Sequence, residues 1–247
     1  MFSASATGKR NLEQGAAGQD ASHCVVTDDV LVAVVCDGAG SVREGRAGSQ
    51  FIAHELAEQL SGVLTAGSTT QDHSEQLDAD IHGAVEAVRT RLAGLAESRQ
   101  LELHDFSCTL LGCVAWPGGG AFFHIGDGFG IWQEAGAQSV LSQPENGEYA
   151  DETYFVTDEN WKQHLRLTPL PEARPGCVIG LMSDGTAPFA VNRARSGFFA
   201  PFIDPIADFL RKATAPNGNE ALRNLLESPR ASEISPDDKT LLLAFVL

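Results

Sequence analysis

Apolar residues recur along the chain at two different spacings, and each spacing predicts a type of element. Over 42–64 and again over 77–103 they return every three or four positions, which is the spacing of one helix face. Shorter patterns of the same kind cover about 202–213 and 220–227. We therefore expect two long helices in the first half of the chain and two shorter ones near its end.

Short, strongly apolar runs predict the strands. Residues 22–36 contain two such runs on either side of Thr27-Asp28-Asp29, which predicts a strand, a tight turn and a second strand. Further runs lie at 106–116, 121–126, 129–133, 177–183 and 240–247, and weaker strand-like pieces lie at 153–156 and 163–168.

The predicted strands and helices occur in clusters. Strict alternation would predict a parallel sheet, whereas clusters favour an α+β fold with antiparallel sheets and helices on their outer faces. No linker divides the chain, so we expect a single domain over 1–247. The segment 143–176 is polar and contains proline, and it interrupts the apolar pattern.

The charge balance excludes several classes of partner. With 17 basic and 33 acidic residues the net charge is −16, which argues against a surface for nucleic acid or for anionic membranes. No run reaches the roughly 18 apolar residues of a membrane span, and the N-terminus lacks the apolar part of a signal peptide. We expect a cytoplasmic protein, and we expect it to be a monomer.

The five cysteines are scattered and mostly lie in apolar runs. No CxxC pair or Cys/His cluster appears, which argues against a zinc site. Buried, reduced thiols are the favoured interpretation.

Candidate chemistry lies at the ends of the predicted strands. Three apolar runs end in Asp-Gly, at Asp37, Asp127 and Asp184. Asp237 instead precedes the last run. If that strand pairs antiparallel beside the one ending at Asp184, the two carboxylates share one edge of the sheet. Asp20 precedes another apolar run, so the same argument brings it to this edge.

Each Asp-Gly pair has a simpler interpretation, because Asp-Gly is a strong signal for a hairpin turn. The combination argues against turns alone, since a predicted helix follows Asp37-Gly38 and Asp237-Asp238 contains no glycine. The segment 34–48 also resembles a dinucleotide-binding loop, but Arg43 occupies the third glycine position and no βαβ pattern follows. His124, inside an apolar run, is interpreted as a core or edge histidine.

A cluster of carboxylates requires a cation, because like charges in close contact do not all remain ionised cheaply. Oxygen-only ligands select hard ions such as Mg²⁺ or Mn²⁺ over zinc or copper. Two such ions bridged by one carboxylate lower the pKa of a shared water and bind a phosphoryl group. The sequence therefore predicts a two-metal centre that hydrolyses phosphate esters.

The same motifs, in order and spacing, resemble those of the protein phosphatase 2C family of metal-dependent Ser/Thr phosphatases. The resemblance covers nearly the whole chain from about residue 8. It implies a four-layer αββα sandwich of two antiparallel sheets flanked by helices, with a Mn²⁺/Mg²⁺ pair in a cleft at one end. It also implies phosphoserine and phosphothreonine in proteins as the substrate. The matching motifs are Gly18-Gln19-Asp20, Val35-Cys36-Asp37-Gly38-Ala39-Gly40, Ser107-Cys108-Thr109, Ile125-Gly126-Asp127, Met182-Ser183-Asp184-Gly185 and Asp237-Asp238-Lys239-Thr240.

The resemblance implies a role for each matching aspartate. By position, Asp37 would bridge the two metals, and the carbonyl of Gly38 would help to bind one of them. Asp184 and Asp237 would hold the first metal, so these two and Asp37 are the expected catalytic set. Asp20 would act near the second metal, directly or through water.

Three further positions carry expectations from the resemblance. Asp127 matches a residue linked in similar proteins to a third, weaker metal. Asp238 stands where the family often has asparagine, which makes Asp237 the better ligand candidate. The segment 143–176 falls where the family carries a flap beside the active site.

Two departures leave the phosphate side of the site open. The family usually has a histidine, a proposed general acid, where this chain has Ala39, and a phosphate-binding arginine where it has Gly15. A catalytically silent member acting as a regulatory binding module is therefore a second hypothesis, and a hydrolase of small phosphate esters is a third. The basic residues that would replace the arginine are Lys9, Arg10, Arg43 or Arg46.

Overall fold

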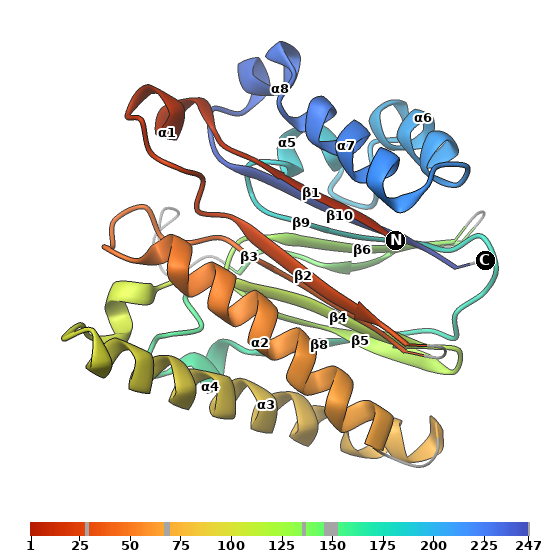
Figure 1. The fold of residues 1–247 in the computed structure, drawn as a ribbon. Helices are drawn as coiled ribbons and strands as arrows, with labels where there is room; N and C mark the ends of the chain where they lie inside the picture. Colours follow the sequence, from red (N-terminus) through yellow and green to blue (C-terminus); the bar gives the residue numbers. More distant parts are fainter. Residues whose placement is uncertain (28–29, 67–69, 135–136, 146–152, 247) are drawn as a thin grey trace.

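The structure is a computed structural model that describes residues 1–27, 30–66, 70–134, 137–145 and 153–246. Two five-stranded antiparallel sheets lie face to face, and helices cover both outer faces (Figure 1). This is the predicted α+β, four-layer αββα sandwich, and the prediction is confirmed.

The first sheet joins the two ends of the described chain. Its strand order is β1-β10-β9-β6-β7, and every pairing is antiparallel. Its strands are β1 (Phe2–Ala6), β6 (Phe129–Gln133), β7 (Val140–Ser142), β9 (Val178–Met182) and β10 (Lys239–Phe245). The helices that pack on its outer face are α5 (Ala187–Ala190), α6 (Ala200–Leu210), α7 (Ala215–Leu226) and α8 (Pro229–Ile234).

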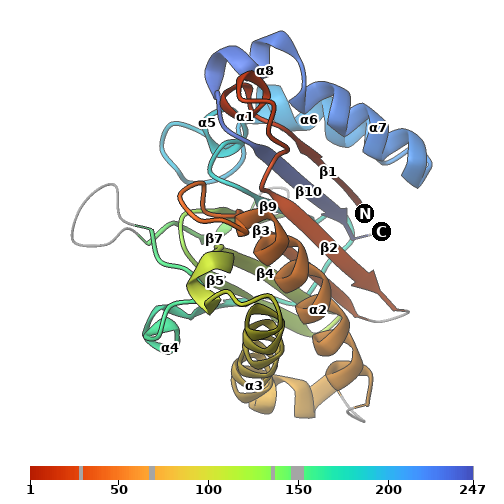
Figure 2. The same ribbon diagram turned by 60° about the vertical axis from the view of Figure 1, so that its left-hand side comes forward.

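The second sheet has the order β2-β3-β4-β5-β8 and is also antiparallel throughout. Two long helices run across its outer face (Figure 2). Its strands are β2 (Ala21–Val26), β3 (Leu31–Cys36), β4 (Leu110–Trp116), β5 (Gly119–Ile125) and β8 (Arg166–Leu170). The helices on this side are α2 (Gly45–Ala66), α3 (Thr70–Ser98) and the short α4 (Trp161–His164), and the turn η1 (Leu103–Phe106) follows α3.

Burial follows the spacing of the apolar residues. On α2 the side chains of Ile52, Leu56 and Leu60 recur at four-residue steps and are fully buried against the second sheet. On β3 the side chains alternate: Val32 and Val34 face the helices, while the neighbouring Ala33 and Val35 face the other sheet. Each buried valine, leucine or isoleucine side chain stabilises the fold by about 1.5–3 kcal/mol relative to an exposed one.

Three sequence expectations differ from the structure. The helix expected over 77–103 runs from Thr70 to Ser98, and Gln100 then adopts a positive φ of 58°, which ends it. The piece 163–168 is divided between α4 and β8, and 153–156 forms no regular strand. Val156 is nevertheless fully buried, because its loop packs against the cluster beneath α2 and α3. Its apolar character reflects that packing.

Strand register brings the carboxylate-bearing loops together. β10 pairs antiparallel with β9, with Leu241 opposite Met182, so the start of β10 lies beside the end of β9, as expected. In the second sheet, Ala21 at the start of β2 lies opposite Cys36 at the end of β3. Both pairings place strand ends at the same end of the sandwich.

Candidate metal centre

Asp20 and Asp37 meet because β2 and β3 pair in register. Asp20 immediately precedes β2 and Asp37 immediately follows β3, so the Ala21–Cys36 pair leaves them side by side. Their carboxyl groups lie close enough to alter each other's ionisation, and the Asp20 side chain is buried.

Asp184 links this pair to the other sheet. It follows β9, and its carboxyl group interacts with those of Asp127 and Asp237 as well as with that of Asp37. Asp127 lies in the turn between β5 and β6, and Asp237 lies just before β10. The structure thus places all five predicted aspartates at this end of the sandwich, near enough for their charges to interact. We call them the aspartate cluster: Asp20, Asp37, Asp127, Asp184 and Asp237.

Hydrogen bonds from neighbouring hydroxyl groups orient the cluster. Ser183 Oγ donates to Asp20 Oδ2 at 2.7 Å and accepts from the backbone N–H of Thr240 at 2.9 Å. Ser183 therefore ties β9, β10 and the start of β2 together. Thr109 Oγ1 accepts from the backbone N–H of Asp37 at 2.9 Å. Both hydroxyl residues lie within the motifs identified in the sequence, but the sequence did not predict this role for them.

Asp238 has a supporting role that the sequence did not reveal. Its side chain is buried and accepts hydrogen bonds from Gly8 N at 2.6 Å, Asn11 Nδ2 at 2.8 Å and Gln19 N at 2.6 Å. These bonds fix the segment that contains α1 (Lys9–Glu13) and leads into Asp20. Asp238 points toward the N-terminal segment, which is consistent with Asp237 being the better ligand candidate.

In two of the three Asp-Gly pairs, glycine is required by a close approach of the backbone and not by a hairpin turn. Neither Gly38 nor Gly185 has a positive φ. A Cβ at Gly38 would collide with the backbone of Gly45 at the start of α2, and a Cβ at Gly185 would collide with the Asp238 carbonyl oxygen. The hairpin interpretation therefore does not explain these two pairs.

The cluster is electrostatically unfavourable when no cation is bound. Burial raises the pKa of Asp20 to about 7, although its hydrogen bond from Ser183 opposes this change. Burial, followed by the charges of Asp127 and Asp237, raises the pKa of Asp184 to about 6. Burial and the charges of Asp20 and Asp184 raise the pKa of Asp37 well above its usual value.

Three carboxylate oxygens of the cluster are buried without a hydrogen-bond partner among the described residues: Asp20 Oδ1, Asp127 Oδ1 and Asp184 Oδ1. Unpartnered buried acceptors are costly. A hard divalent cation would satisfy such oxygens and relieve the repulsion between the carboxylates. The donor set therefore fits Mg²⁺ or Mn²⁺ on chemical grounds.

Basic side chains approach the cluster from two sides. Arg10 Nη1 lies 3.8 Å from Asp237 Oδ2. Arg43, another candidate from the sequence, instead faces Asp105 of η1 at 3.9 Å. On the other side, a cavity of about 440 Å³ is lined by Asp127 and Asp184 and also by Arg193 and Arg195.

The two arginines beside this cavity were missed by sequence reasoning. They lie in a hairpin closed by the bridge between Val191 and Phe198, which follows α5. The guanidinium of Arg195 lies 5.4 Å from the centre of the Phe129 ring. The short segment has no apolar periodicity, so only its basic composition between two strand-like ends would have drawn attention to it.

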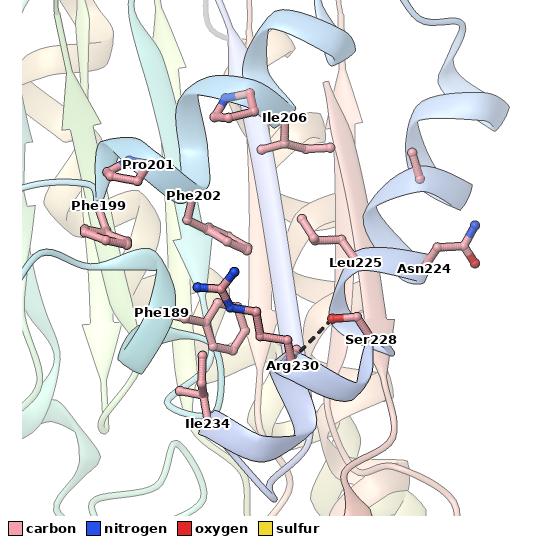
Figure 3. Close-up of a pocket in the computed structure, with 13 residues that line it drawn as sticks. Phe189, Phe199, Pro201, Phe202, Ile206, Asn224, Leu225, Ser228, Arg230 and Ile234 are labelled. Carbon is pink, nitrogen blue, oxygen red and sulfur yellow. Dashed lines mark hydrogen bonds between the residues drawn. The ribbon is translucent and has the colours of Figure 1, made fainter.

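A larger cavity, of about 770 Å³, lies in the helical layer above the first sheet and does not include the cluster (Figure 3). Side chains such as Phe189, Phe202 and Leu225 line it, and Arg230 is the charged residue among its lining (Figure 3). Its lining contains no carboxylate, histidine or cysteine, so it offers no comparable chemistry.

The flap-like segment 143–176 contacts the cluster at one described point. Thr153 Oγ1 donates to Asp127 Oδ2 at 2.9 Å. Pro144 also lines the cavity beside Asp127 and Asp184. Residues 146–152 lie outside the described part of the chain.

His124 is a core histidine, as interpreted from the sequence. It is fully buried, its Nδ1 lies 3.0 Å from Ser142 Oγ, and burial lowers its pKa to about 3.

The family model described as protein phosphatase 2C matches residues 7–227. Serine/threonine-protein phosphatase 3 of Escherichia coli (strain K12) is 31% identical over 218 residues, which is 87% of this chain and 83% of that protein.

Solved structures share the fold at low sequence identity. The serine/threonine phosphatase Stp1 from Staphylococcus aureus has a TM-score of 0.63 at 16% identity, covering 99% of this chain and 94% of that one. The S. agalactiae serine/threonine phosphatase has a TM-score of 0.66 at 15% identity, covering 100% and 98%. RsbX, in complex with magnesium, has a TM-score of 0.55 at 12% identity, covering 98% and 92%.

Proposed function

Because the chain belongs to the protein phosphatase 2C family, we propose that it hydrolyses phosphoserine and phosphothreonine in proteins at a two-metal centre held by the aspartate cluster. The chain is a protein serine/threonine phosphatase. The observation that carries the proposed site is the convergence of five aspartates with three buried, unpartnered carboxylate oxygens. When bound, Mg²⁺ or Mn²⁺ lowers the pKa of a coordinated water and neutralises phosphoryl charge.

The positions in the cluster support a division of roles. Asp37 lies between Asp20 and Asp184 and interacts with both, which suits the bridging position between two ions. The Gly38 carbonyl would help to hold one ion. Asp184 and Asp237 would hold the first ion, and Asp20 would act near the second. Asp127, fixed by Thr153, would serve a third, weaker site.

Gly15 occupies the position of the family's phosphate-binding arginine and offers no positive charge. The basic side chains around the aspartate cluster would provide that charge instead. The chain carries a net charge of −16, so a phosphoprotein needs local positive charge to approach the cluster. We assign the phosphate contact to Arg10, the sequence candidate whose guanidinium lies 3.8 Å from a carboxylate of the cluster. Arg193 and Arg195 would contact the polypeptide that carries the phosphate, since they line the cavity beside Asp127 and Asp184.

The test is phosphate release from a phosphopeptide by purified protein. We expect turnover that requires Mn²⁺ or Mg²⁺ and stops on chelation. Asp37→Asn should lower kcat more than about 100-fold and weaken Mn²⁺ binding in calorimetry, because it removes a charged ligand shared by both ions. Asp78→Asn, the same change at an exposed position on α3, is the matched control and should leave both unchanged.

Two outcomes would contradict the proposal. Full activity of the Asp37→Asn variant would show that the site is elsewhere. Turnover of an aryl phosphate but of no phosphopeptide would favour a hydrolase of small phosphate esters. The regulatory module without catalysis rests on Gly15 and Ala39 alone, and family membership does not favour it.

Several expectations remain predictions. Over the residues that the structure describes, we find no helix with the length and apolar character that crossing a bilayer requires. The cytoplasmic location, the monomeric state, the absence of a nucleic-acid partner and the single catalytic domain over 1–247 all await measurement, as does the flap role of 143–176.

A further inference from the structure

A second group of potential metal ligands lies on the outer face of the second sheet. His23 on β2 and His54 and Glu58 on α2 each offer a ligand atom, and these atoms all lie within 4.8 Å of one another. We call this group the His/Glu cluster. It contains none of the five aspartates, and the proposed phosphatase function does not use it.

The fold brings these three side chains together by two regular spacings. His54 and Glu58 are four residues apart on α2, so they lie on one face of the helix one turn apart. His23 lies two residues from both Ala21 and Val25 and therefore shares their face of β2. Those two side chains pack against the apolar core beneath α2, so His23 also faces the helix. α2 runs alongside β2 in the second view of the fold (Figure 2).

Existing contacts already arrange the ring nitrogens. His23 Nε2 lies 3.0 Å from Glu58 Oε1, and the imidazole rings of His23 and His54 lie 4.6 Å apart between centres. His54 Nδ1 lies 3.1 Å from Glu55 Oε1, which leaves Nε2 of that ring as the ligand atom. A metal-bound histidine commonly donates its other ring N–H to a carboxylate in this way.

The three side chains need to move only a little to coordinate an ion. Ligand atoms on a tetrahedral Zn²⁺ are about 3.4 Å apart, given metal–ligand distances of about 2.0–2.2 Å. The His54 and Glu58 side chains are 56% and 53% exposed, and His23 is 33% exposed. They are therefore free to change rotamer, and the remaining coordination positions would open to water.

We propose that His23, His54 and Glu58 form a transition-metal site that clamps α2 to β2, separate from the aspartate cluster. Two imidazoles and one carboxylate favour Zn²⁺ or Cu²⁺, whereas oxygen-only sites favour Mg²⁺ and Mn²⁺. The two sites thus select different ions. Both clamped elements lead into the aspartate cluster, since Asp20 precedes β2 and the start of α2 contacts Gly38.

Electron paramagnetic resonance of bound Cu²⁺ distinguishes the two sites, because the aspartate cluster has no nitrogen ligand. Metal-free protein is placed in excess Mg²⁺, and one equivalent of Cu²⁺ is added. We expect hyperfine coupling to imidazole nitrogens. His54→Ala and His23→Ala should each remove one nitrogen and weaken Cu²⁺ binding at least about tenfold. His82→Ala, a surface histidine beside Asp78 on α3, is the matched control and should change neither.

A second measurement uses Zn²⁺ and thermal unfolding in the same Mg²⁺ buffer. At about 100 times the dissociation constant, Zn²⁺ should raise the unfolding midpoint by roughly 5 °C or more, and Glu58→Gln should reduce that increase. A Cu²⁺ spectrum without nitrogen coupling would overturn the proposal. So would a spectrum that is unchanged in His54→Ala, or one that is lost in Asp37→Asn. Phosphate release in Mg²⁺ by His54→Ala is expected to equal that of the parent protein.

Discussion

The aspartate cluster and the His/Glu cluster differ in both burial and ligand chemistry. The first gathers five carboxylates where strand ends meet, and leaves three of their oxygens buried without partners among the described residues. The second places two imidazoles and a carboxylate on an exposed helix–strand face. We infer from this comparison that burial, and not ligand number alone, makes a site dependent on its ion. An exposed group is solvated when empty, whereas the partly buried carboxylates of the aspartate cluster then repel one another.

The largest effect that would test this comparison is the pH dependence of stability without metal. Asp20 and Asp184 have folded-state pKa values of about 7 and about 6, above the ordinary value of 3.8. A carboxyl group with a raised folded pKa holds its proton more tightly when folded. Its stabilising contribution is therefore present at low pH and is lost as the pH rises through the folded pKa.

In chelator, we accordingly expect the unfolding midpoint to fall between about pH 4 and pH 7. The fall should be equivalent to a few kcal/mol, because raising one pKa by one pH unit on folding corresponds to about 1.4 kcal/mol. Saturating Mg²⁺ should reverse the fall, because it binds the ionised carboxylates. Calorimetric scans across this range measure both effects. The His54→Ala variant should show the same dependence, and a flat profile in chelator would contradict the electrostatic account.

The next effect concerns Asp238, which holds the N-terminal segment that leads into the aspartate cluster. Asp238→Ala removes the acceptor for Gly8 N, Asn11 Nδ2 and Gln19 N, two of which are backbone donors. We expect a loss of about 2–4 kcal/mol in the free energy of unfolding, measured by urea denaturation. Asp238→Asn keeps one acceptor oxygen and should lose less.

A variant of the His/Glu cluster provides the contrast, because that cluster is exposed. Glu58→Gln should change the free energy of unfolding by no more than about 0.5 kcal/mol when no metal is present. If Asp238→Ala were equally mild, Asp238 would not be the residue that holds the N-terminal segment in place.

The smallest effect is expected at the exposed arginines beside the aspartate cluster. Arg195→Ala should raise KM for a phosphopeptide about three- to tenfold with little change in kcat, because an exposed guanidinium contributes on the order of 1 kcal/mol. The increase should shrink at high salt. Arg174→Ala, an exposed arginine that faces Glu134, is the control. A fall in kcat alone would mean that Arg195 acts on the chemistry and not on binding.

The sequence predicts much of the aspartate cluster, because its residues adjoin strands whose apolar runs are easily recognised. The apolar runs that become β3, β9 and β10 are almost fully buried, and each is flanked by an aspartate. An antiparallel pairing was enough to place Asp184 beside Asp237. β1 was missed, although its alternating burial follows period two, because its five residues are mostly small or polar and give a weak signal.

Other features depend on tertiary contacts that no local pattern contains. His23 and His54 are far apart in sequence, so the His/Glu cluster has no ligand spacing to detect. Asp238 resembles a neighbouring ligand candidate until its three donors are seen. The arginines of the 191–198 hairpin likewise gain meaning only from the cavity that they share with Asp127 and Asp184.

The pairing of β10 with both β1 and β9 has a consequence for protein synthesis. Residues 2–6 pair with residues 239–243, so β1 cannot join the first sheet until β10 has been synthesised. Until then Asp184 has no Asp237 beside it, and the segment around Gly8 lacks its anchor at Asp238. A nascent chain that has reached α7 therefore contains most of the helices but not the assembled cluster. Contacts between such distant residues also slow folding. We therefore expect catalysis by the proposed centre only after β10 has paired with β1 and β9.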